Sequence, residues 1–165
     1  RDGTTHVIYE PVELIERLGK MIQRFEAKVL EHARLKPAYE HLLTLPGVGV
    51  VLALTIMLET GDIERFPTVG DYTSYCRCVR AIHTSNGKKK GEGNRKNGNK
   101  YLAWAFIEAA HYAARYNERI RNYYERKAKK TNKFIAAKAV AHKLARACYH
   151  VLKEQTPFDS ARAFA

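Results

Sequence analysis

The chain has 165 residues, of which 45% are hydrophobic, so it is long enough to form one ordinary domain with a sizeable core. Its formal net charge of +12 arises in the second half: residues 1–82 carry 10 basic and 11 acidic side chains, whereas residues 83–165 carry 19 and 6. This asymmetry favours a polyanionic partner such as a nucleic-acid backbone, and the lack of a run of about 18 apolar residues argues against a membrane partner.

The first predicted element is a helix of about six turns, from Val12 to Leu35. Its apolar residues recur with the 3,4,3,4 spacing that is typical of a coiled-coil seam. This stripe consists of Ile15, Leu18, Ile22, Phe25 and Val29. Two interpretations stay open: the stripe docks on its own domain, or the helix is an arm that pairs with another subunit. Because the sequence starts at Arg1 and its first methionine is Met21, we expect it to be part of a longer protein.

Two apolar helical stretches follow, separated by Pro46-Gly47-Val48-Gly49. This pattern predicts a helix-hairpin-helix over about residues 42–60. The glycines allow a tight reversal, and the second helix would present free backbone N–H groups and its positive dipole end to a phosphate. An ordinary helical hairpin is the alternative. The Pro-Gly-apolar-Gly signature favours contact of Gly47 and Gly49 with a nucleic-acid backbone.

Neither the acidic residues nor the cysteines form a recognisable metal or disulfide pattern. Asp62, Glu64 and Asp71 are explained by roles in turns and helix caps, so no metal site is predicted. The cysteines are an odd and sparse set, which fits free thiols in the cytoplasm better than a disulfide framework. They are Cys76, Cys78 and Cys148.

The stretch from His83 to Lys100 is a basic loop that cannot contribute to a core. It contains one serine, Ser85, together with glycines that let the backbone approach a ligand and cations that attract phosphate. A hydroxyl beside such cations makes Ser85 a candidate nucleophile, although a solvated loop without function is the simpler explanation of the composition. The predicted nucleic-acid contacts in the loop are Lys88, Lys89, Lys90, Arg95, Lys96 and Lys100.

Helical patterns return after the loop. An apolar stripe begins at Leu102, residues 115–133 carry eight basic and two acidic side chains, and residues 134–152 have the spacing of a packing helix. The basic run is a second candidate track for a nucleic-acid backbone. The only Asn-Gly pairs lie in the basic loop without flanking β-branched runs, so an all-α fold with no strands is expected.

The order of these segments is more specific than any one of them. TLPGVG, GDIERF, a short helix with tyrosine, TSNGKKKG and KNGNKYL follow one another between about Leu42 and Leu152. In this order the chain resembles the C-terminal transposase domain of the DEDD-type insertion-sequence transposases, which include Piv-like invertases and recombinases directed by a bridge RNA. The resemblance implies a coiled-coil-like arm over residues 1–36, the transposase domain over 37–156 and a tail over 157–165.

In that family a RuvC-like N-terminal domain binds metal through four carboxylates, and the C-terminal domain supplies a catalytic serine. Carried over, this implies that Ser85 is the nucleophile, forming a phosphoserine link to DNA. It also implies that Lys96 and Asn99 match the family's Lys-x-Gly-Asn segment, and both are predicted to contact nucleic acid. The chain would need the RuvC-like domain and its Mg²⁺, with no cofactor of its own. The implied partners are DNA, a guide RNA and further copies of the chain. A non-catalytic helix-hairpin-helix module is the alternative. Where many relatives have Gly and Pro after the tyrosine, this chain has Cys76-Arg77-Cys78.

Overall fold

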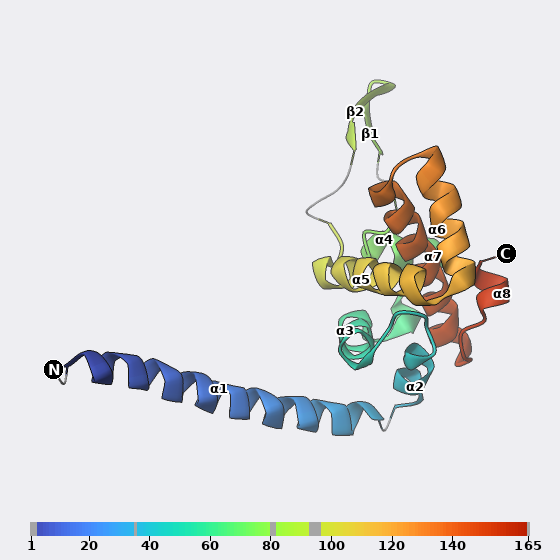
Figure 1. Ribbon diagram of the computed structural model, residues 1–165. Helices are drawn as coiled ribbons and strands as arrows, with labels where there is room; N and C mark the ends of the chain where they lie inside the picture. The colour runs from blue at the N-terminus through green and yellow to red at the C-terminus, as the bar shows by residue number, and fades with distance from the viewer. Residues whose placement is uncertain (1–2, 35, 80–81, 93–96, 165) are drawn as a thin grey trace. The chain divides into compact units, whose positions relative to one another are not determined.

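The structure is a computed structural model that describes residues 3–34, 36–79, 82–92 and 97–164. The chain divides into two compact units, Arg1–Lys36 and Pro37–Ala165. The first unit is the single helix α1 (Gly3–Arg34; Figure 1). The predicted start of this helix at Val12 is wrong, because α1 continues through Pro11. A proline removes one backbone hydrogen bond, which does not by itself end a helix of this length.

The apolar stripe of α1 is exposed along its length. Ile15 is 68% exposed and Phe25 is 65% exposed, and Leu18, Ile22 and Val29 are exposed as well. Charged residues occupy the other faces, so α1 has one apolar and one polar side.

The second unit is built mainly from α-helices (Figure 1). In chain order its helical elements are α2 (Pro37–Leu43), α3 (Val50–Thr60), the 3-10 turn η1 (Ile63–Arg65), α4 (Val69–Tyr75), α5 (Lys100–Tyr116), α6 (Glu118–Lys130), α7 (Lys133–Glu154) and α8 (Ser160–Ala163). Helix α7 is the centre of the unit, since α2, α4, α5 and α6 all pack on it, while α3 packs on α2 and α5. The predicted all-α class is confirmed.

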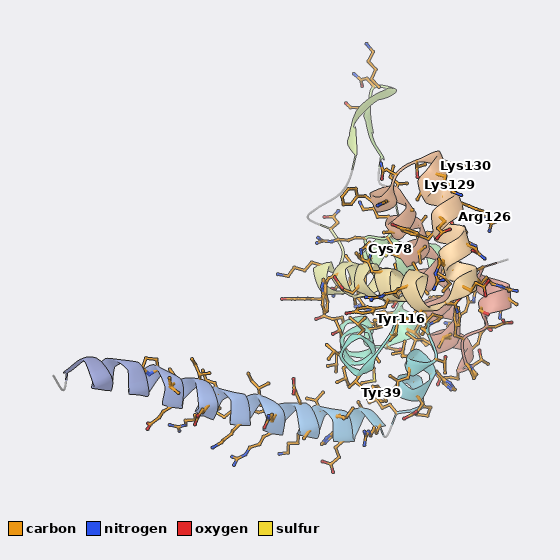
Figure 2. All side chains as sticks on the ribbon, in the orientation of Figure 1. Tyr39, Cys78, Tyr116, Arg126, Lys129 and Lys130 are labelled. Atoms are coloured by element: carbon orange, nitrogen blue, oxygen red, sulfur yellow. The ribbon has the colours of Figure 1, made fainter. Side chains whose placement is uncertain are left out.

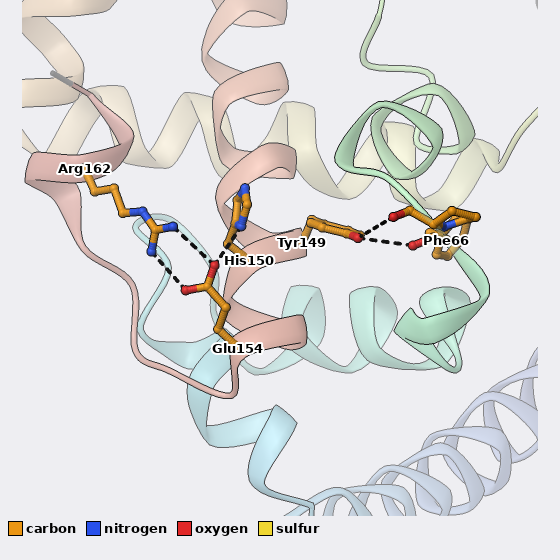
Figure 3. A network of polar contacts seen from close by, with 6 residues as sticks. Phe66, Tyr149, His150, Glu154 and Arg162 are labelled. Atoms are coloured by element: carbon orange, nitrogen blue, oxygen red, sulfur yellow. Dashed lines mark hydrogen bonds and ion pairs between the residues drawn. The ribbon is translucent and has the colours of Figure 1, made fainter.

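Alanines form much of the buried surface of α5 and α7. They are Ala105, Ala109, Ala110 and Ala113 of α5, and Ala136, Ala137, Ala141 and Ala145 of α7. Such small side chains let helices approach closely. Larger residues fill the space beside them: Tyr72 and Phe106 are fully buried with their rings edge to face. The Tyr149 hydroxyl donates to the carbonyls of Phe66 (3.2 Å) and Pro67 (3.3 Å; Figure 3), which ties α7 to the turn before α4.

The acids between α3 and α4 have the predicted turn and cap roles. The Asp62 carboxylate accepts from the Glu64 amide at 2.9 Å and caps η1. Thr68 and Asp71 form a reciprocal capping box at the start of α4. These contacts fix the path by which the chain enters α4.

The basic loop contains a feature that the sequence analysis excluded. Strands β1 (Ile82–Ser85) and β2 (Lys88–Glu92) form an antiparallel hairpin, so the expectation of a loop without strands is wrong here. Asn86 (φ 52°) and Gly87 (φ 70°) both have positive φ, as a two-residue turn matched to strand twist requires. The turn residues favour the hairpin even though β-branched residues are scarce around them.

Residues 157–165, predicted as a tail, carry α8 and are fastened to the end of α7. Arg162 contacts both carboxylate oxygens of Glu154, at 2.9 and 3.2 Å, and Nδ1 of His150 lies 2.9 Å from the same carboxylate (Figure 3). Phe164 is 4% exposed.

Helix α6 buries one side only and is polar elsewhere. In α6 the one residue fully buried is Ile120, and the remainder are exposed or half-buried. Within the described ranges, no helix is both long and apolar enough to cross a membrane.

Candidate nucleic-acid interface

The hairpin places the candidate nucleophile at its tip. Ser85 is the last residue of β1 and pairs with Lys88, the first residue of β2, across the Asn86-Gly87 turn (Figure 1). Directly opposed residues of an antiparallel pair project from the same face, with Cβ atoms about 4.5–5.5 Å apart. Ser85 is half-buried and Lys88 is exposed. The register therefore gives the Ser85 hydroxyl a cationic neighbour.

A β-bulge interrupts the hairpin between His83 and Thr84. Thr84 pairs with Lys89 but His83 pairs with Gly91, so Lys90 is the extra residue on β2. A bulge bends its strand and increases the local twist, and bulges are frequent next to active sites. The three predicted lysines thus occupy distinct backbone positions, two in register near the tip and one at the bulge.

The remaining predicted cations lie on the C-terminal side of the hairpin. Arg95 and Lys96 fall outside the described residues. Lys100 is exposed at the start of α5, with its ammonium 4.8 Å from the ring centre of Tyr101. Lys100 is therefore accessible to an anion that approaches the first turn of α5 from solvent.

The C-terminal foot of the hairpin is packed tightly. Gly98 has φ 82°, and a Cβ added there would lie 2.5 Å from the carbonyl oxygen of Tyr75 and 3.2 Å from that of Ser74. The Asn99 amide donates to the same Tyr75 carbonyl at 2.7 Å. Only glycine fits at position 98, because both the backbone conformation and the space exclude a side chain.

Asn99 joins three helices. Its Oδ1 accepts from the amides of Tyr101 (2.8 Å) and Leu102 (3.0 Å), which caps α5. Its Nδ2 donates to the Glu59 carboxylate of α3 (2.5 Å) and to the Tyr75 hydroxyl of α4 (3.4 Å). The side-chain amide is thus fully engaged within the protein. The predicted contact of Asn99 with nucleic acid stays a prediction.

The N-terminal foot of the hairpin is formed by Arg77. Arg77 has φ 55°, a left-handed conformation that glycine adopts more easily. Its Nη2 donates to the Gly98 carbonyl at 2.8 Å, so the arginine links the two feet of the hairpin. Its Nε is buried without a hydrogen-bond partner in the described structure. The side chain compensates for the strained backbone by this link.

Helix α7 flanks the same foot. His142 forms a hydrogen bond to the backbone of Cys78, while burial and the nearby charge of Arg146 lower the pKa of this histidine, which is therefore neutral at pH 7. Burial raises the pKa of the Cys78 thiol to about 12, with the charge of Lys138 opposing the rise. Sequence reasoning missed these α7 residues, because it assigned His142 to a packing face. The sequence signal that could have identified Lys138, His142 and Arg146 is their spacing of four residues, which places them on one side of a helix.

The two glycines of the predicted helix-hairpin-helix turn face different surroundings. A Cβ on Gly47 (φ 78°) would lie 2.2 Å from the Ala109 carbonyl oxygen, so this glycine is needed for close packing on α5. Gly49 is exposed, and it precedes α3 without a side-chain cap. Val50 and Val51 are exposed as well. The start of α3 is therefore open to solvent, which a phosphate-binding site requires. The predicted contacts of Gly47 and Gly49 with a nucleic-acid backbone stay predictions.

The basic run of α6 lies on the surface. Arg126, Lys129 and Lys130 are exposed, and Figure 2 shows them toward the C-terminal end of the helix. Cations in the last turn also complement the negative end of the helix dipole. This surface can therefore serve helix stability and anion binding together.

The described residues offer no built metal centre. Within these ranges no three His, Cys, Asp or Glu side chains come together as metal ligands would. The cysteines are free thiols, as predicted. The resemblance implies Mg²⁺ in a RuvC-like domain and not in these residues, and that expectation stays a prediction.

Comparison with known protein families shows which family the chain belongs to. A model of the transposase IS116/IS110/IS902 family matches residues 39–125, more than half of the chain. The chain belongs to this transposase family. The segment matched in this transposase-family chain includes the Gly47–Gly49 turn before α3, the hairpin with Ser85, and the Asn99 cap.

Two curated relatives support the family assignment. The transposase for insertion sequence element IS1328 of Yersinia enterocolitica is 24% identical over 146 residues, which cover 86% of this chain and 44% of that protein. An uncharacterized 43.6 kDa protein of insertion element IS110 of Streptomyces coelicolor is 29% identical over 101 residues, covering 61% and 25%. The chain thus spans less than half the length of either relative.

Proposed function

We propose that the chain is the DNA-binding, serine-bearing part of a transposase, and that Ser85 attacks a DNA phosphodiester. One observation carries the proposal: within the segment matched by the family, the hairpin pairs Ser85 with Lys88 at its tip. A hydroxyl next to a cation is suited to attack at phosphorus, because the cation stabilises charge on the phosphoryl oxygens.

The proposed attack exchanges one phosphoester bond for another. Ser85 Oγ forms a bond to phosphorus, the bond from phosphorus to a deoxyribose oxygen breaks, and that oxygen takes a proton. The phosphoserine ester conserves the energy of the broken linkage, so the hydroxyl of another DNA end can reverse the step and rejoin the strands. Lys88 is a cation and cannot accept the Ser85 proton while it is charged.

The base must therefore come from elsewhere. We expect it from a RuvC-like domain that binds Mg²⁺ outside the described residues, as the family resemblance implies. The support for this expectation is the family resemblance. The chain alone is then expected to bind DNA without cutting it.

Replacement of Ser85 tests the nucleophile in a transposase that contains this chain together with its RuvC-like domain. Ser85→Ala should leave DNA affinity nearly unchanged but abolish covalent protein–DNA adducts, detected as labelled DNA that stays with the denatured protein. Ser74→Ala is the matched control, since Ser74 is an exposed serine of α4. If adducts persist in Ser85→Ala, the chain is instead a non-catalytic nucleic-acid-binding module.

Self-association through α1 is a second part of the proposal. The exposed stripe has heptad spacing, and its large apolar side chains are the kind that pair in coiled coils. Ile15→Glu with Ile22→Glu should convert a dimer to a monomer in sedimentation equilibrium. A chain that is monomeric before substitution, or still dimeric after it, contradicts this role.

A guide RNA is the third proposed partner, in addition to DNA. Its support is the family resemblance and the strongly basic second half of the chain, because RNA and DNA share the phosphate backbone. Ribonuclease treatment of the purified transposase should then remove sequence-selective DNA binding while leaving non-selective binding. Selective binding that survives the treatment excludes the guide.

A further inference from the structure

Three side chains of α7 line an open groove that begins at the hairpin. Lys138, His142 and Arg146 are spaced four residues apart, so they lie along one side of the helix. The same groove is lined by Arg77 and Gly98, which form the feet of the hairpin. Lys138 and Arg146 are exposed and His142 is half-buried. The groove therefore offers a line of donors that leads to the nucleophile-bearing segment.

The contacts at the hairpin end show that the groove and the hairpin feet are one assembly. His142 bonds to the backbone of Cys78, and the charge of Lys138 acts on the Cys78 thiol. Arg77 holds the opposite foot through the Gly98 carbonyl, while its Nε is buried without a hydrogen-bond partner in the described structure. An anion beside these groups would meet donors from α7 and from the hairpin foot together.

The charges along the groove are unevenly distributed. Among the described residues that line it, the acidic ones are Glu154 and Asp159, both at the tail end. Glu154 is paired with Arg162 and His150 (Figure 3), and Asp159 caps α8. The carboxylates at the α8 end of the groove are therefore already engaged within the protein. At the hairpin end, no carboxylate among the described lining residues lies beside the cations.

We propose that the hairpin end of this groove binds the DNA backbone beside the linkage that Ser85 attacks. From Lys138 to Arg146 the helix rises about 12 Å at about 1.5 Å per residue. Phosphates of one strand of a duplex recur about every 3.4 Å along the axis, so the stripe spans about four of them. The two cations neutralise phosphates, and His142, whose hydrogen bond goes to the backbone of Cys78, holds the hairpin foot beside them. This site deepens the proposed function and rests on it.

The test measures DNA affinity of the 165-residue chain against salt concentration, with a short duplex as probe. Lys138→Ala/Arg146→Ala should lower the slope of log affinity against log salt by about 1.8, at about 0.9 per lost phosphate contact. Lys20→Ala/Arg24→Ala of α1 removes the same charge and should leave the slope unchanged. An equal drop in both variants, or no drop in the first, overturns the site. Circular dichroism checks that both variants fold, as expected for exposed positions.

A photo-crosslinking residue shows whether the nucleic acid lies in the groove or is merely attracted by the overall charge of the chain. It also shows whether the groove binds DNA or RNA. p-Benzoylphenylalanine at position 138 should crosslink to labelled duplex DNA, and the same residue at position 20 should not. Crosslinking to RNA of the same sequence but not to DNA overturns the choice of DNA as occupant. Loss of the groove result leaves the Ser85→Ala adduct result intact, so failure of this site and failure of the proposed nucleophile are distinguishable.

Discussion

The tip and the base of the hairpin are built on opposite principles. At the base, Gly98 and Asn99 contact residues of α3 and α4, and each polar group of the Asn99 side chain is bonded within the protein. At the tip, Ser85 and Lys88 pair with one another, and a Cβ on Gly87 would meet nothing within 4 Å. The base is fixed by packing, and the tip is left open for a ligand.

This difference teaches how a basic segment that cannot form a core can still be positioned. Its two feet are joined by Arg77 and Gly98 and held by α4, α5 and α7, while the cations remain at the other end. Substitutions at the base should therefore change stability, and substitutions at the tip should change binding or chemistry alone.

The largest expected effect is that of alkaline pH on the buried thiols of Cys76, at the end of α4, and Cys148, in α7. Burial raises the pKa of Cys148 to about 12 and raises that of Cys76 further, so both thiols stay protonated in the folded state. In the unfolded chain thiols ionise near pH 8.5, so stability is complete below that pH and is lost as pH rises. Each thiol should cost about 1.4 kcal/mol per pH unit above 8.5. Urea unfolding from pH 8 to 10 measures this loss. Cys148→Ala should weaken the pH dependence; an unchanged dependence contradicts the explanation.

A matched pair of glycines gives the next largest effect. Gly98→Ala places a Cβ against the Tyr75 carbonyl at φ 82° and should lower the free energy of unfolding by about 3 kcal/mol. Gly87→Ala has the same positive φ but open space around the new Cβ, so only the backbone strain remains and the free energy of unfolding should fall by about 1 kcal/mol. Urea titration of both variants measures the difference. Equal losses at the two positions contradict the division between base and tip.

Asn99 should contribute more to the free energy of unfolding than an ordinary helix cap does. Asn99→Ala removes the α5 cap together with the bonds to Glu59 and Tyr75, for a loss of about 2 kcal/mol. Asn132 caps α7 through one bond to Ile135, and Asn132→Ala should cost about 1 kcal/mol. Thermal unfolding compares the two variants. If the losses are equal, the links from Asn99 to α3 and α4 carry no net stability.

The smallest effect on stability is expected at the tip. Replacing Lys88, Lys89 and Lys90 by alanine should leave the urea midpoint unchanged but reduce the salt dependence of DNA binding by about 0.9 per lost contact. A control replaces Lys20, Arg24 and Lys28 of α1, which removes the same charge. A tip variant with the control's slope shows that the lysine tract lies off the DNA path.

Local chemistry in the sequence predicted part of this arrangement. Heptad spacing indicated α1, and the caps at Asp62 and Thr68 could be recognised from residue type. The hairpin could not be predicted from strand propensity, because β-branched residues are scarce around it and the signal lies in the turn conformation of Asn86-Gly87. The base depends on contacts between residues distant in sequence, such as Asn99 with Glu59, and periodicity carries no information about these.

The two-residue turn makes the hairpin sensitive to its length. Side chains of a strand alternate between faces, so a single residue inserted between Asn86 and Gly87 would change the register and rotate Lys88 away from Ser85. The glycine- and lysine-rich composition tolerates many exchanges of residue type. The number of residues between Ser85 and Lys88 cannot change in this way. In the hairpin, insertions and deletions should therefore reduce recombination more than any substitution outside Ser85 does.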